Sequence, residues 1–192
     1  MSVVIHEVSH GYVAGMLGDP TARLAGRLSL NPLRHLDLFG SVIVPLLTSL
    51  TGFTFGWAKP VPVNPYNLRG GQRGEMLVAA AGPLSNLLIA VIFGLFIRIS
   101  LSEGFITAPL LHIATLIVVI NLVLTIFNLV PIPPLDGSKI LFPFLSSRFS
   151  GVGEWIERNG LILLVIFIFF LWQFFEPLVR HLFTLFTGIA IP

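Results

Sequence analysis

The sequence predicts an all-α protein that crosses a membrane several times. We expect about four to six hydrophobic helices, plus a re-entrant or short β element between the first two confident spans. The first observation is composition, since 55% of the 192 residues are hydrophobic and 10% are charged, whereas a soluble domain carries about a quarter charged residues. The second is that several apolar stretches approach the roughly 20 residues needed to cross a bilayer. The mean hydropathy of +0.92 agrees with both.

We expect one transmembrane domain over residues 1–192, because no polar linker or low-complexity tract divides the chain. The net charge of +2 gives no reason to expect a nucleic-acid partner. The basic residues are spread along loops, where they report membrane orientation instead. The absence of cysteine excludes disulfides and thiolate metal ligands. Nothing in the sequence indicates an oligomeric state.

The first apolar segment runs from Met1 to about Leu17 and carries a possible metal motif. His6 and His10 lie four residues apart, so on a helix both imidazoles share one face and can bind one metal ion. Glu7 is placed to act as the general base of a hydrolytic reaction. The alternative is a chance match, and a soluble zinc protease would show the same motif. The motif therefore indicates a chemistry and not a family.

Two of the later apolar segments are confident spans. They run from about Met76 to Ile99 and from about Ala108 to Val130. The last apolar tract, Leu161 to Ile191, is broken by Glu176-Pro177. It predicts either one span plus a short surface helix or a bent hairpin of two short helices.

The distribution of basic residues orients these spans. Lys and Arg dominate the charged residues between Gly18 and Glu75 and recur between Pro131 and Asn159, whereas the loop 100–107 holds only Glu103. The positive-inside rule therefore makes the first two regions cytoplasmic and the loop external.

The segment from Leu36 to Phe55 is apolar but contains Pro45. Because both of its flanks are predicted to be cytoplasmic, a single crossing is excluded. We expect it to enter the membrane and turn back, or to lie in the interface. Re-entrant backbone needs cover from protein or a water-filled cavity, so this segment is a possible wall of an active-site cavity.

Asp136 follows the span from about Ala108 to Val130, after a proline-rich run. A carboxylate at a membrane boundary is costly unless it is paired, hydrated or bound to metal. Asp136 should lie at the same depth as His6 and His10, where it would complete a site of two histidines and one carboxylate with one position open for water. The alternative makes it a cap or turn residue before Gly137.

Together these features resemble the site-2 protease family of intramembrane zinc metalloproteases, in its short form without PDZ or CBS domains. Four blocks carry the resemblance in family order: His6 to Ala14, Gly56 to Pro65, Ala80 to Asn86, and Asn128 to Gly137. They cover most of the chain up to about Gly137. The tail after Ser146 matches only as generic hydrophobic helix.

The resemblance implies one zinc ion per chain, with His6, His10 and Asp136 as its ligands and Glu7 as the general base. It also implies that Asn128 helps to polarise the scissile carbonyl, for which the alternative is a helix–helix hydrogen bond.

Three further residues are candidates for substrate binding. Asn86 has close helix packing as its alternative role. Lys59 and Pro60 begin a run to Pro65 whose prolines exclude a central strand. The resemblance places this run in a re-entrant or edge-strand element against which an unwound substrate could lie.

The function implied is an intramembrane zinc endopeptidase that cleaves transmembrane segments of single-span substrates, as in regulated intramembrane proteolysis. It would be a multi-pass protein of the prokaryotic plasma (inner) membrane, in contact with the lipid bilayer and with its active site towards the cytoplasm. The alternative is a metal-binding membrane protein of the same fold without proteolysis, acting as a binder or in metal handling. The substrate and the regulatory pathway are not indicated.

The amino terminus departs from the family pattern. Only Met1 to Ile5 precede the metal motif, whereas a span needs about 17 to 25 residues. Met1 is also too close to His6 for a cleaved signal peptide. We therefore expect a truncated amino-terminal helix, through a mis-assigned start codon or a fragment.

Overall fold

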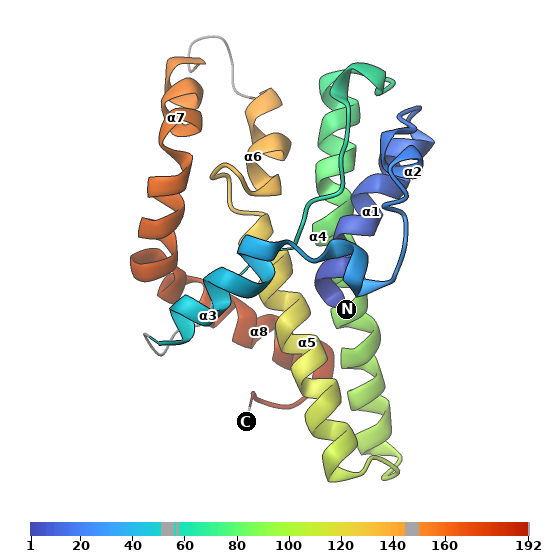
Figure 1. The fold of residues 1–192 in the computed structure, drawn as a ribbon. Helices are drawn as coiled ribbons and strands as arrows, with labels where there is room; N and C mark the ends of the chain where they lie inside the picture. Colours follow the sequence, from blue (N-terminus) through green and yellow to red (C-terminus); the bar gives the residue numbers. More distant parts are fainter. Residues whose placement is uncertain (51–55, 57, 145–149, 192) are drawn as a thin grey trace. The chain divides into compact units, whose positions relative to one another are not determined.

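The computed structural model describes residues 1–50, 56, 58–144 and 150–191 (Figure 1). The chain forms two compact units. The first unit holds Met1 and Val3–Val78, and the second holds Ser2 and Ala79–Pro192. Each unit is described by itself.

The helical fold class is confirmed, with corrections to its details. The described residues contain no strand. They include three helical stretches long and apolar enough to cross a membrane: α4 (Gln72–Ser102), α5 (Ala108–Asn128) and Gly153–Phe174. The expected four to six spans and the re-entrant or short β element are therefore not supported.

The Pro45 segment forms helices and no strand in its described residues. It forms a π-helical stretch, η2 (Leu38–Ile43), followed by α3 (Val44–Ser49). Together these are too short to cross a bilayer. The part of the expected segment from Thr51 to Phe55 lies outside the described residues, as does Trp57 of the second family block.

The first unit is built from short helices. They are α1 (Ser2–Met16), α2 (Thr21–Leu24), η1 (Pro32–His35), η2, α3 and η3 (Pro65–Asn67). Helix α1 ends where expected, because Gly18 adopts a φ of +105° that other residues rarely adopt. A small apolar cluster of Ala14, Leu68 and Val78 closes this unit.

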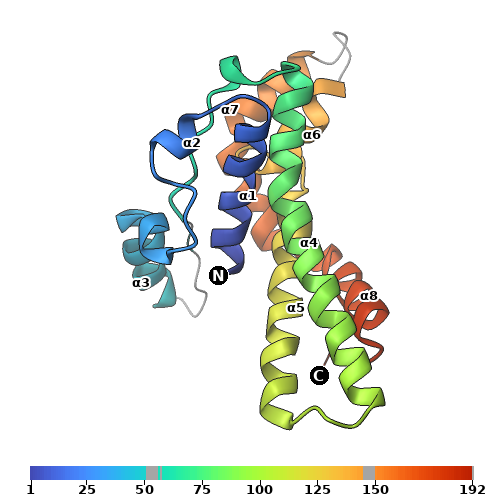
Figure 2. The same ribbon diagram turned by 90° about the vertical axis from the view of Figure 1, so that its right-hand side faces the viewer.

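The second unit is built around long helices. Helices α4 and α5 run side by side and are joined by the short loop 103–107 (Figures 1 and 2). Helix α8 (Glu176–Thr187) packs against α5. Ile97, Leu122 and Phe183, one from each helix, have no exposed surface. The approach is close, since a Cβ on Gly94 would lie 2.6 Å from Cβ of Phe186.

The carboxyl-terminal tract is one candidate span followed by a short helix. Helix α7 (Ser150–Ile166) continues through η6 (Phe167–Leu171) and η7 (Trp172–Phe174). Helix α8 starts next, with Pro177 in its first turn, where a missing N–H costs no helical bond. One candidate span followed by a separate short helix matches the helices of the first expected arrangement, although the span starts at Gly153 rather than near Leu161. The position of α8 at a membrane surface stays a prediction. A six-residue helix, α6 (Asp136–Leu141), and the short η4 (Phe142–Phe144) complete the unit.

Candidate metal centre

His6 and His10 lie together on one face of α1, as their spacing predicts. Their side chains are buried, with 6% and 8% exposed. The two ring centroids are 4.7 Å apart and the rings meet edge to face, at 86°. Helical geometry alone produces this pair, because residues four apart stand one above the other.

A hydrogen bond fixes the chemical form of His10. Its Nδ1 lies 2.7 Å from the carbonyl oxygen of Val78, in α4. A carbonyl can only accept, so Nδ1 carries the proton and the neutral ring has its lone pair on Nε2. That is the arrangement in which histidines usually bind zinc, with the second nitrogen donating to a carbonyl. The Nε2 atom of His10 therefore fits a zinc ion.

Glu7 is half-buried and has a partner that the sequence did not predict. Its Oε2 accepts a hydrogen bond of 2.8 Å from the backbone N–H of Val61, 54 positions away. The bond occupies one carboxylate oxygen and holds the side chain in one orientation.

Asp19 is a second buried carboxylate in the first unit. Its oxygens accept from the backbone N–H and hydroxyl of Thr21, from the backbone N–H of Asn64 and from the Asn67 amide. Burial by itself raises the pKa of Asp19, but these hydrogen bonds outweigh it and lower that pKa from 3.8 to about 2. Asp19 was not among the candidate site residues expected from the sequence. The Asp-x-Thr spacing, typical of an Asx-turn, was the available signal.

Lys59 and Pro60 have exposed side chains, and their backbone groups are held in place. The Arg27 guanidinium donates to the carbonyl oxygens of Lys59, Pro60 and Arg34. The Lys59 N–H donates to the carbonyl oxygen of His35. A role for either residue in substrate binding stays a prediction.

Asp136 belongs to the second unit, where it is the first residue of α6. The N-cap of this helix is Leu135, so Asp136 is not the capping residue that the alternative reading proposed. Its position is set by Gly137, where a Cβ would collide with the carbonyl oxygens of Leu129 and Val130. Only glycine allows α6 to start so close to the end of α5. The ligand role of Asp136 stays a prediction.

Two asparagines of the second unit were also candidates. Asn128 is the last residue of α5, and its Nδ2 donates 2.9 Å to the carbonyl oxygen of Leu124 in the same helix. The sequence predicted that this span runs to about Val130, whereas α5 ends at Asn128 with Leu129 as its C-cap. Asn86 has no exposed surface within α4. Their roles in catalysis and substrate binding stay predictions.

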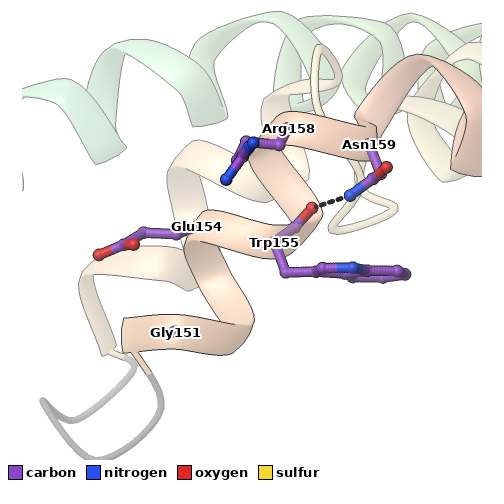
Figure 3. Close-up of a pocket in the computed structure, with 5 residues that line it drawn as sticks. All are labelled: Gly151, Glu154, Trp155, Arg158 and Asn159. Atoms are coloured by element: carbon purple, nitrogen blue, oxygen red, sulfur yellow. Dashed lines mark hydrogen bonds between the residues drawn. The ribbon is translucent and has the colours of Figure 1, made fainter.

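A hollow on α7 is separate from all of these residues. It has a volume of about 530 Å³ and is lined by Gly151, Glu154, Trp155, Arg158 and Asn159 (Figure 3). The Asn159 amide donates 2.8 Å to the Trp155 carbonyl oxygen within the helix. These lining residues include none of the candidates for catalysis, metal binding or substrate binding.

Comparisons with known proteins agree with the zinc motif. Residues 99–172 match the model of peptidase family M50. A Bacillus subtilis (strain 168) protein named "Putative zinc metalloprotease YwhC" is 36% identical over an alignment of 179 positions, which covers 88% of this chain and 77% of the relative. A Mycolicibacterium smegmatis protein named "Putative zinc metalloprotease Rip2" is 27% identical, and the alignment covers 88% of this chain and 63% of Rip2.

A more distant relative is archaeal. "Zinc metalloprotease MJ0392" of Methanocaldococcus jannaschii is 28% identical over 78% of this chain, and the match spans 34% of its length. The chain thus covers less than two thirds of this relative and of Rip2. No solved structure matches the chain significantly.

Proposed function

The chain belongs to peptidase family M50, and from this premise we propose that it is an intramembrane zinc endopeptidase. Its substrates would be single-span membrane proteins, cut within their transmembrane segments. Three apolar helices long enough to span a bilayer support the membrane setting. The observation that carries the proposal is the arrangement on α1, where two histidines face one another beside a carboxylate held by backbone.

The proposed zinc ligands are His6, His10 and Asp136. The tautomer of His10 supports its role, because Nε2 bears the lone pair. Asp136 would supply the third, oxygen ligand and leave one position open, as catalytic zinc sites require. The family resemblance of both sequence blocks supports this set, with one ion per chain.

The chemistry follows from the groups around these ligands. When bound, zinc lowers the pKa of a water molecule towards neutrality and polarises a carbonyl. Glu7 accepts the proton of the attacking water and later returns it to the leaving amine. Its Oε2 is already held by Val61, so Oε1 is the oxygen proposed for proton transfer.

Asn128 would stabilise the oxyanion that develops on the scissile carbonyl. Its amide nitrogen has two hydrogens, of which one binds the Leu124 carbonyl. The second can donate to substrate. A fixed neutral donor of this kind typically contributes about 3 kcal/mol to transition-state stabilisation.

The substrate must present an unwound segment, since a helix hides its carbonyls in internal hydrogen bonds. We propose that Lys59 and Pro60 contact this segment, with Asn86 as a further candidate. By the positive-inside rule the site faces the cytoplasm, in a prokaryotic plasma membrane.

The test uses the full chain in proteoliposomes with a purified single-span substrate. The zinc-loaded protein should release two peptide products, whereas Glu7→Gln should retain one zinc by mass spectrometry and release none. Glu154→Gln, an exposed acid on α7, is the matched control and should cleave normally. Zinc flux into the vesicles without peptide products would instead support the non-proteolytic, metal-handling alternative and contradict the proposal.

A further inference from the structure

The segment from Lys59 to Asn67 has few backbone donors. Prolines occupy positions 60, 62 and 65, and proline has no N–H. The Lys59 N–H donates to the carbonyl oxygen of His35. The Val61 N–H donates to the Glu7 carboxylate, and the Asn64 N–H donates to the Asp19 carboxylate. The Val63 N–H makes no hydrogen bond within the described residues. Two of these donors are therefore used on buried or half-buried carboxylates of α1 and the turn that follows it.

Both ends of the segment are anchored within the first unit. At one end, the Arg27 guanidinium lies 2.7 Å from the Lys59 carbonyl oxygen. At the other, Asp19 takes the Asn64 N–H at 2.7 Å and the Asn67 amide at 3.0 Å. The Val61 N–H lies between these anchors, so its direction is set by groups on either side.

The Val61 side chain presses the segment onto α1. A Cβ on Gly11 would come within 2.8 Å of Cγ1 of Val61 and 2.6 Å of Cδ2 of Leu28. Val61 is itself buried, with 7% exposed. The close contact at Gly11, one turn after Glu7, keeps the Val61 N–H within reach of the Glu7 carboxylate.

We infer that the Val61 N–H is a positioning donor for the Glu7 carboxylate and that Asp19 anchors the segment which carries it. The inference rests on the proposed function only for the role of Glu7 as general base. By holding Oε2, the N–H restricts the carboxylate to one orientation and directs Oε1 to proton transfer. Misplacement of such a group by about 1 Å can cost roughly a hundredfold in rate.

The first test needs neither zinc nor activity. Amide hydrogen exchange is measured at Val61 and Asn64 in the metal-free protein. Glu7→Ala should speed exchange at Val61 at least tenfold while Asn64 stays protected. Asp19→Ala should speed exchange at Asn64, whose N–H loses its acceptor. It should also speed exchange at Val61, because the anchor of the segment is lost. Equal Val61 exchange in the wild type and Glu7→Ala would overturn the inference.

The second test replaces the Val61 N–H by an oxygen atom. Incorporation of the α-hydroxy analogue of valine at position 61 replaces the amide by an ester, and the same change at Val63 reports the cost of an ester alone. The kcat of the Val61 ester should be at least tenfold below that of the Val63 ester, with equal KM and zinc content. Equal kcat values for the two esters would contradict the inference.

A double-mutant comparison separates positioning from general damage. In a Glu7→Asp background, where the shorter side chain has lost its contact with Val61, the ester at Val61 should lower kcat less than twofold further. A purely structural role would instead give the same tenfold loss in both backgrounds. If the wild type shows no peptidase activity, the proposed function fails, and the exchange experiment still decides the positioning of Glu7.

Discussion

Each of the two units of this chain is stabilised internally by a different kind of interaction. In the first unit, Asp19, Glu7 and Arg27 bind backbone groups of connecting segments. In the second, α4, α5 and α8 satisfy their own backbone and pack through apolar side chains such as Leu122 and Phe183. Backbone N–H groups of irregular segments need hydrogen-bond acceptors elsewhere in the chain. Where the acceptor is a carboxylate, the same group can also take part in acid–base chemistry. The general base candidate, Glu7 on the regular helix α1, is therefore held by the irregular segment that contains Val61.

The difference between the two units is tested most strongly by removing a proposed metal ligand from the first unit. His10→Ala should lower zinc affinity at least a hundredfold, because catalytic zinc is held by only three protein ligands. His112→Ala, an exposed histidine on α5, is the control and should keep wild-type affinity. Zinc titration with a competing chelator measures both. Unchanged affinity in His10→Ala would show that the metal motif of α1 binds no zinc.

The apolar core of the second unit should respond next most strongly. Phe183→Ala should lower the free energy of unfolding by about 3 to 5 kcal/mol, since it opens a cavity in a fully buried position. Phe174→Ala changes a side chain that is 70% exposed and should cost about 0.5 kcal/mol or less. Reversible unfolding in mixed micelles would compare them, and similar losses for the two variants would refute this account of the core.

Asp19 is the corresponding test of the polar unit. Asp19→Asn should lower the free energy of unfolding by about 1 to 3 kcal/mol, because several hydrogen bonds to a charged group are weakened or lost. Glu103→Gln, in an exposed loop, should have an effect within about 0.5 kcal/mol. An Asp19→Asn variant as stable as the wild type would mean that this carboxylate does not stabilise the first unit.

The pH dependence of the same residue gives a signed prediction. The pKa of Asp19 is about 2 in the folded chain, against 3.8 for the ordinary group. The stability from its ionised form, about 2 kcal/mol, is therefore present above pH 4 and lost as the pH falls from about 4 to 2. The stability difference between the wild type and Asp19→Asn should shrink over that interval. A difference that grows as the pH falls would contradict the sign.

The smallest effect is expected at the surface of α8. Glu176 and Arg180 form an ion pair with a closest distance of 2.6 Å, but their side chains are 54% and 59% exposed. Glu176→Gln should cost about 0.5 kcal/mol or less, since water and salt screen such pairs. A loss as large as that of Phe183→Ala would show that the ion pair, and not the apolar face of α8, holds this helix.

The sequence predicted those parts of the molecule that depend on local periodicity. The pairing of His6 and His10 follows from their spacing, and α4 and α5 follow from long apolar runs. The third span was placed too late, because Glu154, Glu157 and Arg158 interrupt its apolar pattern although the helix continues through them. Charged side chains at a helix end can extend into water without ending the helix.

The parts that were missed depend on contacts between distant positions. The Val61 N–H that holds Glu7 is a backbone group, and its bond depends on the path of a proline-rich segment rather than on side-chain identity. The expected β element was wrong for a related reason. The same prolines leave too few donors for strand pairing, and the N–H groups of Val61 and Asn64 donate to carboxylates instead.

We propose that Asp136 joins the two histidines in binding zinc, and the chain offers a direct test of that claim because it contains no cysteine. In an Asp136→Cys variant loaded with zinc, any bond between zinc and a thiolate of the chain must come from position 136. X-ray absorption at the zinc edge should then show one sulfur at about 2.3 Å beside nitrogen neighbours at about 2.0 Å. A spectrum with bound zinc and only nitrogen and oxygen neighbours, like that of the wild type, would contradict the claim.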